Sequence, residues 1–221
     1  MPELKTKTDD TDVIGDEHYS SSAETPLRPD AFVLSDAQKM KIIAEHFHEI
    51  MYTLGLDMND DSLKGTPKRV AKMYVKEIFS GLNPDNKPEV ALFENKYQYN
   101  EMLIEKDITL FSNCEHHFVP IIGKVHVAYI PHGNVIGLSK INRLVQYYAK
   151  RPQVQERLVN QIAQGLKEAL NSENVAVVID AVHLCVSSRG IKDTNSSTIT
   201  SSFSGKFENE KTKMEFLTLV K

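Results

Sequence analysis

The chain has 221 residues, of which 41% are apolar, enough for one sizeable packed domain with a tail or for two small ones. Its formal net charge is −4 and its isoelectric point is about 6.1, which argues against a nucleic-acid-binding protein held by bulk charge. No apolar run approaches the roughly 18 residues that a membrane-spanning helix needs, and the first residues lack the apolar core of a secretory signal. With two cysteines and no such signal, we expect a cytoplasmic protein without a structural disulfide.

Three regions follow from composition. Residues 1–34 are polar, mixed in charge and interrupted by Pro26 and Pro29, which predicts a disordered or loosely docked tail. Residues 35–100 predict an N-terminal helical region that ends in a loop from about residue 83. Residues 101–221 predict a single domain of strands and helices.

Two helices are expected in the first region. Ser35 opens a capping-box pattern, and apolar residues then recur at helical spacing until Gly55, which is placed as a C′ glycine. Thr66 and Pro67 form the N-cap and first position of a second helix. Gly81 is expected to end that helix.

Residues 101–221 predict two hairpins with two helices between them. The first hairpin has strands at 102–111 and 124–130, with 120–123 as its turn and His126 on its surface. Helices follow from Ser139, expected as an N-cap, and from Arg151. The second of these, the fourth helix in chain order, has a predicted apolar face of Val154, Leu158, Ile162, Leu166 and Ala169. A strand over 175–186, another after residue 194 and a short helix over 210–221 complete the order. This pattern predicts an α+β fold, an antiparallel sheet with helices on one face.

Cys114-Glu115-His116-His117 places four residues that bind metals or move protons in one run, and His183-Leu184-Cys185 supplies the second cysteine. Thiolate and imidazole are preferred zinc ligands, and three protein ligands with one open position typify catalytic zinc. We interpret Cys114, His117 and Cys185 as these ligands. Spacing alone also fits two buried cysteines that act as small hydrophobes. On a strand, His183 and Cys185 would share a face, so that one holds the metal while the other handles a proton.

Cations gather near two helix starts. Lys68 and Arg69 lie in the first turn of the second helix, where positive charge is slightly unfavourable, which suggests an anion to bind, although a solvated surface pair explains them more simply. Lys140 and Arg143 lie near Ser139, where an anion site and an ordinary capped helix have similar weight.

Taken together, the motifs resemble GTP cyclohydrolase I from about residue 38 to the C-terminus. The blocks that carry the resemblance are Cys114–His117, Val135–Arg143, Arg151–Leu158, and His183–Cys185 with Arg189-Gly190. Thr66–Arg69 and the Ser196, Thr198, Thr200, Gly205 pattern extend it. The joint order of these blocks is very specific. One departure is Ser188, where the family often has methionine.

The resemblance implies a tunnelling fold, in which ββααββ units join their sheets around a ring into an oligomeric barrel. It also implies a homodecamer of two pentamers with active sites at subunit interfaces, so that one chain would not hold a complete site. The implied reaction converts GTP and water to 7,8-dihydroneopterin triphosphate and formate, the first step of pterin and folate biosynthesis.

The resemblance also implies the role of each site residue. Zn²⁺ on Cys114, His117 and Cys185 would activate the water that attacks C8 of the purine. His183 would protonate N7, His116 would be a second active-site histidine, and Ser139 would assist at the ribose. Glu156, helped by Gln155, would accept hydrogen bonds from guanine and so reject adenine. The candidates for binding the triphosphate are Arg69, Lys140, Arg143 and Arg189.

Other classes make different demands. A zinc nucleobase deaminase needs His-x-Glu and Pro-Cys-x-x-Cys, and neither occurs in this sequence. A non-catalytic zinc-binding or purine-binding member of the same fold should lack the ligands or the acid, whereas both are present. A structural zinc site would need a fourth protein ligand, for which His116 is the obvious candidate.

Overall fold

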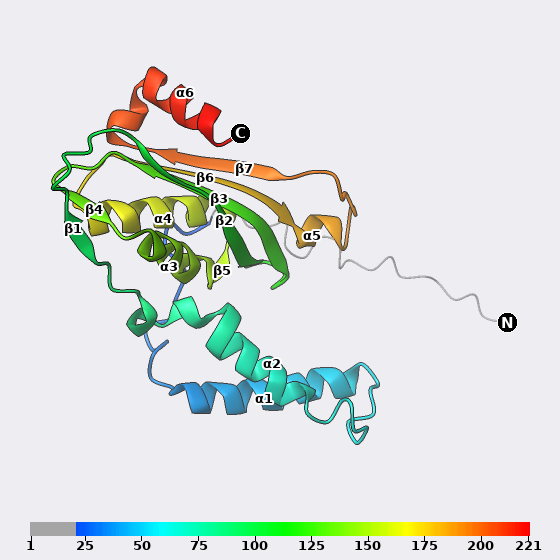
Figure 1. Ribbon diagram of the computed structural model, residues 1–221. Helices are drawn as coiled ribbons and strands as arrows, with labels where there is room; N and C mark the ends of the chain where they lie inside the picture. The colour runs from blue at the N-terminus through cyan, green and yellow to red at the C-terminus, as the bar shows by residue number, and fades with distance from the viewer. Residues whose placement is uncertain (1–20) are drawn as a thin grey trace.

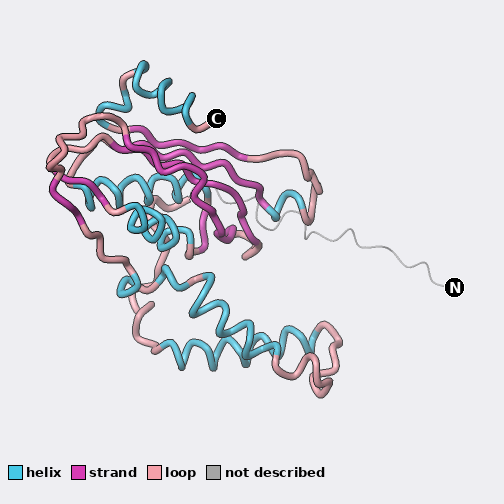
Figure 2. The backbone as a smooth tube through the Cα atoms, in the orientation of Figure 1, coloured by secondary structure: helices cyan, strands magenta, loops and turns pink. Residues whose placement is uncertain are grey.

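The computed structural model describes residues 21–221, so residues 1–20 of the predicted tail lie outside the described part of the chain. Figures 1 and 2 show a curled sheet with helices packed on it and a separate helical hairpin beneath. The α-helices are α1 (Asp36–Thr53), α2 (Thr66–Met73), α3 (Leu138–Ala149), α4 (Gln155–Leu170), α5 (Leu184–Ser187) and α6 (Glu210–Leu219). The strands are β1 (Leu92–Glu94), β2 (Leu103–Cys114), β3 (Pro120–Tyr129), β4 (Asn134–Ile136), β5 (Pro152–Gln153), β6 (Val175–His183) and β7 (Thr198–Phe203).

Helix α1 has the predicted ends. The Ser35 hydroxyl accepts from the Gln38 N–H, and the Gln38 side chain accepts from the Ser35 N–H, which is the complete capping box. Leu54 is the C-cap, and Gly55 follows it at a φ of +84°, a left-handed conformation that glycine adopts without strain. Both predictions for this helix are confirmed.

Helix α2 differs from the prediction at both ends. Its N-cap is Gly65, so the N-cap expected at Thr66 is wrong by one residue. The Thr66 hydroxyl is turned to the side, where it accepts from Arg69 Nη2 at 2.7 Å. The helix widens into a π-helical turn over Tyr74–Ile78, and Gly81 lies in a 3₁₀ turn after it.

The main sheet has the strand order β5-β2-β3-β6-β7. All neighbouring strands are antiparallel except β5, which runs parallel to the end of β2. Strands β1 and β4 pair separately. The sequence did not predict β1, β4 or β5, because two or three residues are too few for a period of two to be recognised.

The turn of the first hairpin is not where the sequence placed it. Residues 120–123 belong to β3, and the chain reverses over residues 115–119. Pro120 occupies the first position of the strand, where its missing N–H is tolerated. Gly123 lies inside β3 because β6 approaches closely: a Cβ there would be 2.1 Å from the Asp180 carbonyl oxygen. Proline and glycine therefore mark a strand start and a close contact, not a turn.

Helices α3 and α4 cover one face of the sheet and form the main core with β2, β3 and β6. Leu144 of α3 and Leu158, Ile162 and Leu166 of α4 are fully buried there. The apolar face predicted for the fourth helix is confirmed. The helix begins at Gln155, however, because the preceding residues pair with the end of β2.

Strand β6 ends at His183, three residues earlier than expected, and Cys185 lies in the short helix α5. The inference that His183 and Cys185 share a strand face is therefore wrong. The chain turns between them.

The opposite face of the sheet is also covered, so the prediction of helices on one face only is wrong. Phe207 and Phe216, the latter on α6, pack against Ala128, Ala176 and Val178. His126 points to this second face by strand alternation and is only 6% exposed, which corrects its expected surface position. Its Nδ1 accepts the Asp107 N–H at 3.2 Å.

The buried His126 predicts a contribution to acid sensitivity. Burial lowers the pKa of His126, so below about pH 6.5 the unfolded chain takes up a proton that the folded chain resists. Stability that is complete above pH 6.5 is therefore lost on acidification, by at most about 1.4 kcal/mol per pH unit. His126→Gln should flatten the decline of the melting temperature between about pH 6.5 and 5. His48→Gln, at an exposed histidine of α1, is the matched control, and an unchanged decline in H126Q would contradict the prediction.

None of the helices within residues 21–221 combines the length and the apolar character needed to cross a bilayer.

Candidate metal centre and active site

Three predicted ligands come together at one end of the sheet. Cys114 is the last residue of β2, His117 lies in the turn that follows, and Cys185 lies on α5. One possible ligand atom from each residue lies within 4.8 Å of the other two. Cys114 is buried, Cys185 is half-buried and His117 is exposed, so the group is closed towards the core and open towards solvent. This arrangement could hold a metal ion.

The turn after β2 is fixed by its own hydrogen bonds. The Phe118 N–H donates to the Cys114 carbonyl and the Cys114 N–H donates to the Val119 carbonyl, each at 2.9 Å. Phe118 adopts a φ of +54°, and its ring centroid lies 5.1 Å from that of Phe79 and 6.5 Å from that of Tyr74. The turn is thus anchored both to the sheet and to the helical hairpin.

Strand pairing brings the second cysteine to the same place. Ile121 at the start of β3 is opposite His183 at the end of β6, so α5 begins beside the turn that carries His117. Burial raises the pKa of the Cys185 thiol to about 11, and the neighbouring Cys114 adds to the shift. Two thiolates this close repel each other, and a divalent cation between them would remove that cost. The donor set therefore suits a soft or borderline divalent metal.

His116 is also within reach of the group. Its Nδ1 lies 3.7 Å from Cys114 Sγ, and its Nε2 lies 3.8 Å from Glu115 Oε1. The geometry thus keeps His116 beside the candidate metal position. Its predicted roles, a second active-site histidine or a fourth ligand, both need this proximity.

His183 has a fixed orientation. Gln155 on α4 donates from Nε2 to the Ile179 carbonyl, the Thr198 carbonyl and the Thr200 hydroxyl. Its Oε1 must therefore face His183, and His183 Nε2–H donates to it at 2.7 Å. The other ring nitrogen, Nδ1, is the one left to exchange a proton.

Two opposing effects act on the pKa of His183. Burial lowers the pKa of His183, and the carboxylate of Glu156 raises it by a smaller amount. Glu156 is exposed in the first turn of α4, so it is accessible to a ligand near His183. Gln155, in contrast, is 1% exposed and uses both ends of its amide on protein partners. Within one chain, the Gln155 side chain is therefore not exposed for its predicted contact with guanine.

The predicted phosphate-binding residues are scattered. Arg189 lies at the candidate metal group, where its Nη1 donates to His117 Nε2 at 2.7 Å. Arg69 lies on α2 in the helical hairpin and donates to the Ser62 carbonyl and to Thr66. Figure 1 shows this hairpin as a unit apart from the sheet.

Ser139, Lys140 and Arg143 lie at the far end of α3. Helix α3 runs alongside β2 in the same direction: Asn142 donates to Glu105, Gln146 donates to the Thr109 carbonyl, and Ser112 donates to the Ala149 carbonyl. The end of α3 that approaches Cys114 is therefore its C-terminus. Within one chain, the N-terminal residues of α3 do not reach the Cys114 group. Ser139 also caps nothing, since the N-cap is Gly137.

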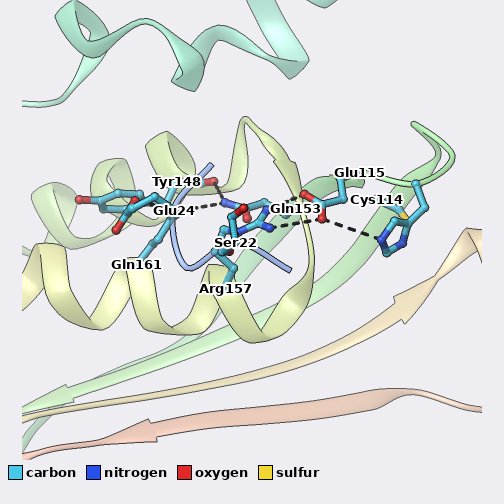
Figure 3. A network of polar contacts seen from close by, with 9 residues as sticks. Ser22, Glu24, Cys114, Glu115, Tyr148, Gln153, Arg157 and Gln161 are labelled. Atoms are coloured by element: carbon cyan, nitrogen blue, oxygen red, sulfur yellow. Dashed lines mark hydrogen bonds and ion pairs between the residues drawn. The ribbon is translucent and has the colours of Figure 1, made fainter. Parts of the chain in front are cut away.

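A buried polar network behind the turn was missed from the sequence. Figure 3 shows Arg157 and Gln161 of α4, Gln153 of β5 and Glu115 of the turn joined by hydrogen bonds. Arg157 is 4% exposed, although arginine is rarely buried without a partner. The spacing of four between Arg157 and Gln161 was a usable signal, because it places two polar residues on one helical stripe beside the apolar face.

Several known proteins are similar to this chain over most of its length. The family model described as GTP cyclohydrolase I matches residues 43–221. GTP cyclohydrolase 1 of Flavobacterium johnsoniae is 61% identical over 210 residues, which covers 95% of this chain and 94% of that protein. GTP cyclohydrolase 1 of an Enterobacter species is 55% identical over 90% of both chains. The protein of the same name from Salmonella arizonae is 53% identical over 95% of both.

Among solved structures, the archaeosine synthase QueF-Like in the apo form matches 48% of this chain and 94% of its own, with 20% identity and a TM-score of 0.39. That likeness is too weak to carry an argument. The family match covers most of the chain, and the identities exceed half of the aligned residues over nearly the full length of each relative. The chain therefore belongs to the GTP cyclohydrolase I family.

Proposed function

We propose that this protein converts GTP and water to 7,8-dihydroneopterin triphosphate and formate, the first step of pterin and folate biosynthesis. The observation that carries the proposal is the cluster of Cys114, His117 and Cys185 with an oriented His183 on the neighbouring strand end, in a chain of this family. GTP metabolism and two free thiols both suit the cytoplasm.

Zinc is the proposed cofactor. Two thiols and one imidazole are ligands that zinc prefers, and three protein ligands leave a fourth position for water or substrate. Zinc held there would supply the activated water that hydrolysis at C8 of the purine requires, because it lowers the pKa of bound water to about 7.

His183 is the proposed proton donor to N7 of the purine as the imidazole ring opens. Its Nε2–H is committed to Gln155, so Nδ1 is the nitrogen that would carry the proton to the substrate. Burial lowers the pKa of His183 and the Glu156 carboxylate opposes this shift only in part, so a proton taken up at Nδ1 is readily released to the substrate. Gln155 thus supports His183, in place of the direct guanine contact expected from the resemblance.

Glu156 is the proposed guanine-recognition residue. Its carboxylate is exposed and near enough to His183 to act on its charge. Guanine offers N–H donors to a carboxylate at its Watson–Crick edge, whereas adenine would leave the carboxylate without them. The arrangement of Glu156 beside the proton donor fits one purine lying across both.

The remaining predicted groups support a site shared between copies of the chain. Arg189 is the one predicted phosphate-binding residue at the metal group of the same chain, whereas Ser139, Lys140 and Arg143 lie at the opposite end of α3. We propose that a second copy of the chain supplies these three residues to the triphosphate and the ribose. Arg69 would come either from this second copy or from the copy that holds the metal. A tunnelling-fold barrel, closed by sheets from several subunits in a decamer of two pentamers, would make this possible.

A non-catalytic zinc-binding or purine-binding protein of the same fold is the alternative. It would explain the Cys–His–Cys group. It would leave the Gln155–His183 hydrogen bond and the exposed Glu156 without a purpose.

The test is to incubate the zinc-loaded protein with GTP and to follow formate release and pterin absorbance together. Both products should appear, and a chelator should abolish both, because the proposed water activation needs the metal. ATP is the control substrate and should give neither product. Formate without pterin would place the failure in the ribose rearrangement around Ser139. The absence of both products in a zinc-loaded oligomer would overturn the proposed function.

A further inference from the structure

A buried ion pair lies directly behind the candidate metal group. Arg157 Nη1 is 2.5 Å from Glu115 Oε2, and Arg157 Nη2 is 3.2 Å from Glu115 Oε1. The Arg157 side chain is 2% exposed and that of Glu115 is 18% exposed, so this pair is shielded from water. The two parallel hydrogen bonds match the fork of a guanidinium to the two oxygens of a carboxylate.

The ion pair reaches the predicted ligands through the turn itself. Glu115 stands between Cys114 and the His116-His117 pair, and its main-chain N–H donates to the Gln153 carbonyl at 3.0 Å. Side chain and main chain of Glu115 are therefore both held. A residue fixed at two points between two ligands limits how far these ligands can move apart.

The other side of Arg157 is closed by the N-terminal segment. Arg157 Nε donates to the Ser22 carbonyl at 2.7 Å, so the Nε–H group, which Glu115 does not reach, also has an acceptor. Nearby, Gln161 Nε2 donates to Glu24 Oε2 at 2.9 Å. Figure 3 shows this segment lying across α4. Residues from a stretch predicted as a loose tail thus contact the support of the metal group.

A buried guanidinium with a missing partner is costly, so each of its contacts has consequences for the others. Without the Ser22 carbonyl, Arg157 would have to turn towards water or another acceptor, and either movement would pull on Glu115. The same reasoning runs in the opposite direction, because loss of Glu115 would leave the Arg157 charge buried and unpaired.

We propose that Ser22, Glu24, Arg157 and Glu115 form a brace that holds the Cys114–His117 turn in the geometry that retains the metal. Arg157 and Glu115 are positioning residues, and neither touches the substrate. The proposal rests on the proposed zinc site and deepens it, since it assigns retention of the metal partly to a segment far from the ligands in sequence.

The first test measures the rate at which zinc passes from the loaded protein to a colorimetric chelator. Glu115→Gln and Arg157→Lys should each accelerate zinc loss roughly tenfold, the lower end of the range for groups that orient metal ligands. The double variant should lose zinc no faster than the faster single variant, because both changes break one interaction. Additive effects would overturn the coupling, and a wild-type rate in E115Q would overturn the brace.

Two controls separate this role from general destabilisation. Circular dichroism identifies any variant that is unfolded at the assay temperature. E115Q preserves the shape of the side chain and so keeps the test valid if R157K does not fold. Glu168→Gln, at an exposed position of the same helix, should leave zinc loss at the wild-type rate.

The second test compares two truncations of the zinc-loaded chain. Removal of residues 1–20 leaves Ser22 and Glu24 in place and should not change the rate of zinc loss. Removal of residues 1–24 should raise that rate several-fold, because the Arg157 Nε donor then loses its acceptor. Equal rates for the two truncations would remove the N-terminal segment from the brace. If the full chain binds zinc but makes no formate from GTP, the proposed function fails, whereas these zinc-loss rates still decide on the brace.

Discussion

Cys185→Ser is expected to leave the protein without bound zinc and to lower formate release from GTP by about a thousandfold or more. A hydroxyl is a far weaker ligand than a thiolate for a borderline-soft metal, so two protein ligands would remain where three are needed. Loss of the metal removes several kcal/mol of transition-state stabilisation, and each 1.4 kcal/mol or so is a factor of ten in rate. Zinc content by atomic absorption and formate release are the two measurements.

Val186→Ala provides the matched control on the same helical turn. It changes an exposed apolar side chain next to Cys185 and should retain one zinc per chain. If C185S also retains one zinc per chain, Cys185 is not a ligand. His116, with Nδ1 3.7 Å from Cys114 Sγ, would then be the candidate for the third position.

His183→Ala is expected to keep the metal and to slow ring opening roughly 100- to 10,000-fold, the range that a positioned general acid supplies. The His183 imidazole is not among the three grouped candidate ligands, so the zinc content should stay at the wild-type value. The loss should fall on kcat, because the proton is needed in the transition state and not for GTP binding.

Removal of the His183 ring also leaves Gln155 Oε1 without its donor, which costs about 1–3 kcal/mol at a buried site. His183→Asn separates the two effects, since its amide can still donate towards Gln155 but cannot titrate. It should recover part of the melting temperature and none of the rate. His48→Ala, at an exposed histidine of α1, should behave as the wild type. Zinc loss in H183A would show that a ligand has been misassigned.

Local rules predicted the elements whose signals lie within a few residues. The Ser35 capping box and the end at Gly55 followed from side-chain hydrogen bonds and backbone freedom that act over one turn. The apolar face of α4 followed from a period that burial against one sheet face imposes. The order of major helices and strands needed no more information than this.

The errors arose where a partner distant in sequence decides the local conformation. Residues 120–123 contain proline and glycine, the usual signs of a turn, yet the first is tolerated at a strand start and Gly123 serves the close approach of Asp180. His126 alternates with apolar residues as a surface residue would, but a second layer containing Phe216 covers that face. Neither neighbour can be inferred from the residues beside it.

The sequence by itself determined which side chains are candidates for metal binding and proton transfer, because the ligand preferences of two cysteines and neighbouring histidines are fixed by atom type. It also determined the family, through the order of the blocks. Only the tertiary structure decided how these side chains meet. Pairing of β3 with β6 brings Cys185 beside Cys114, although residues 184–186 do not continue the strand as expected. The tertiary structure also places Arg157 behind Glu115, and it places the N-terminus of α3 away from both residues. Bond chemistry is local to a residue, whereas distance between residues is set by which surfaces the whole chain buries.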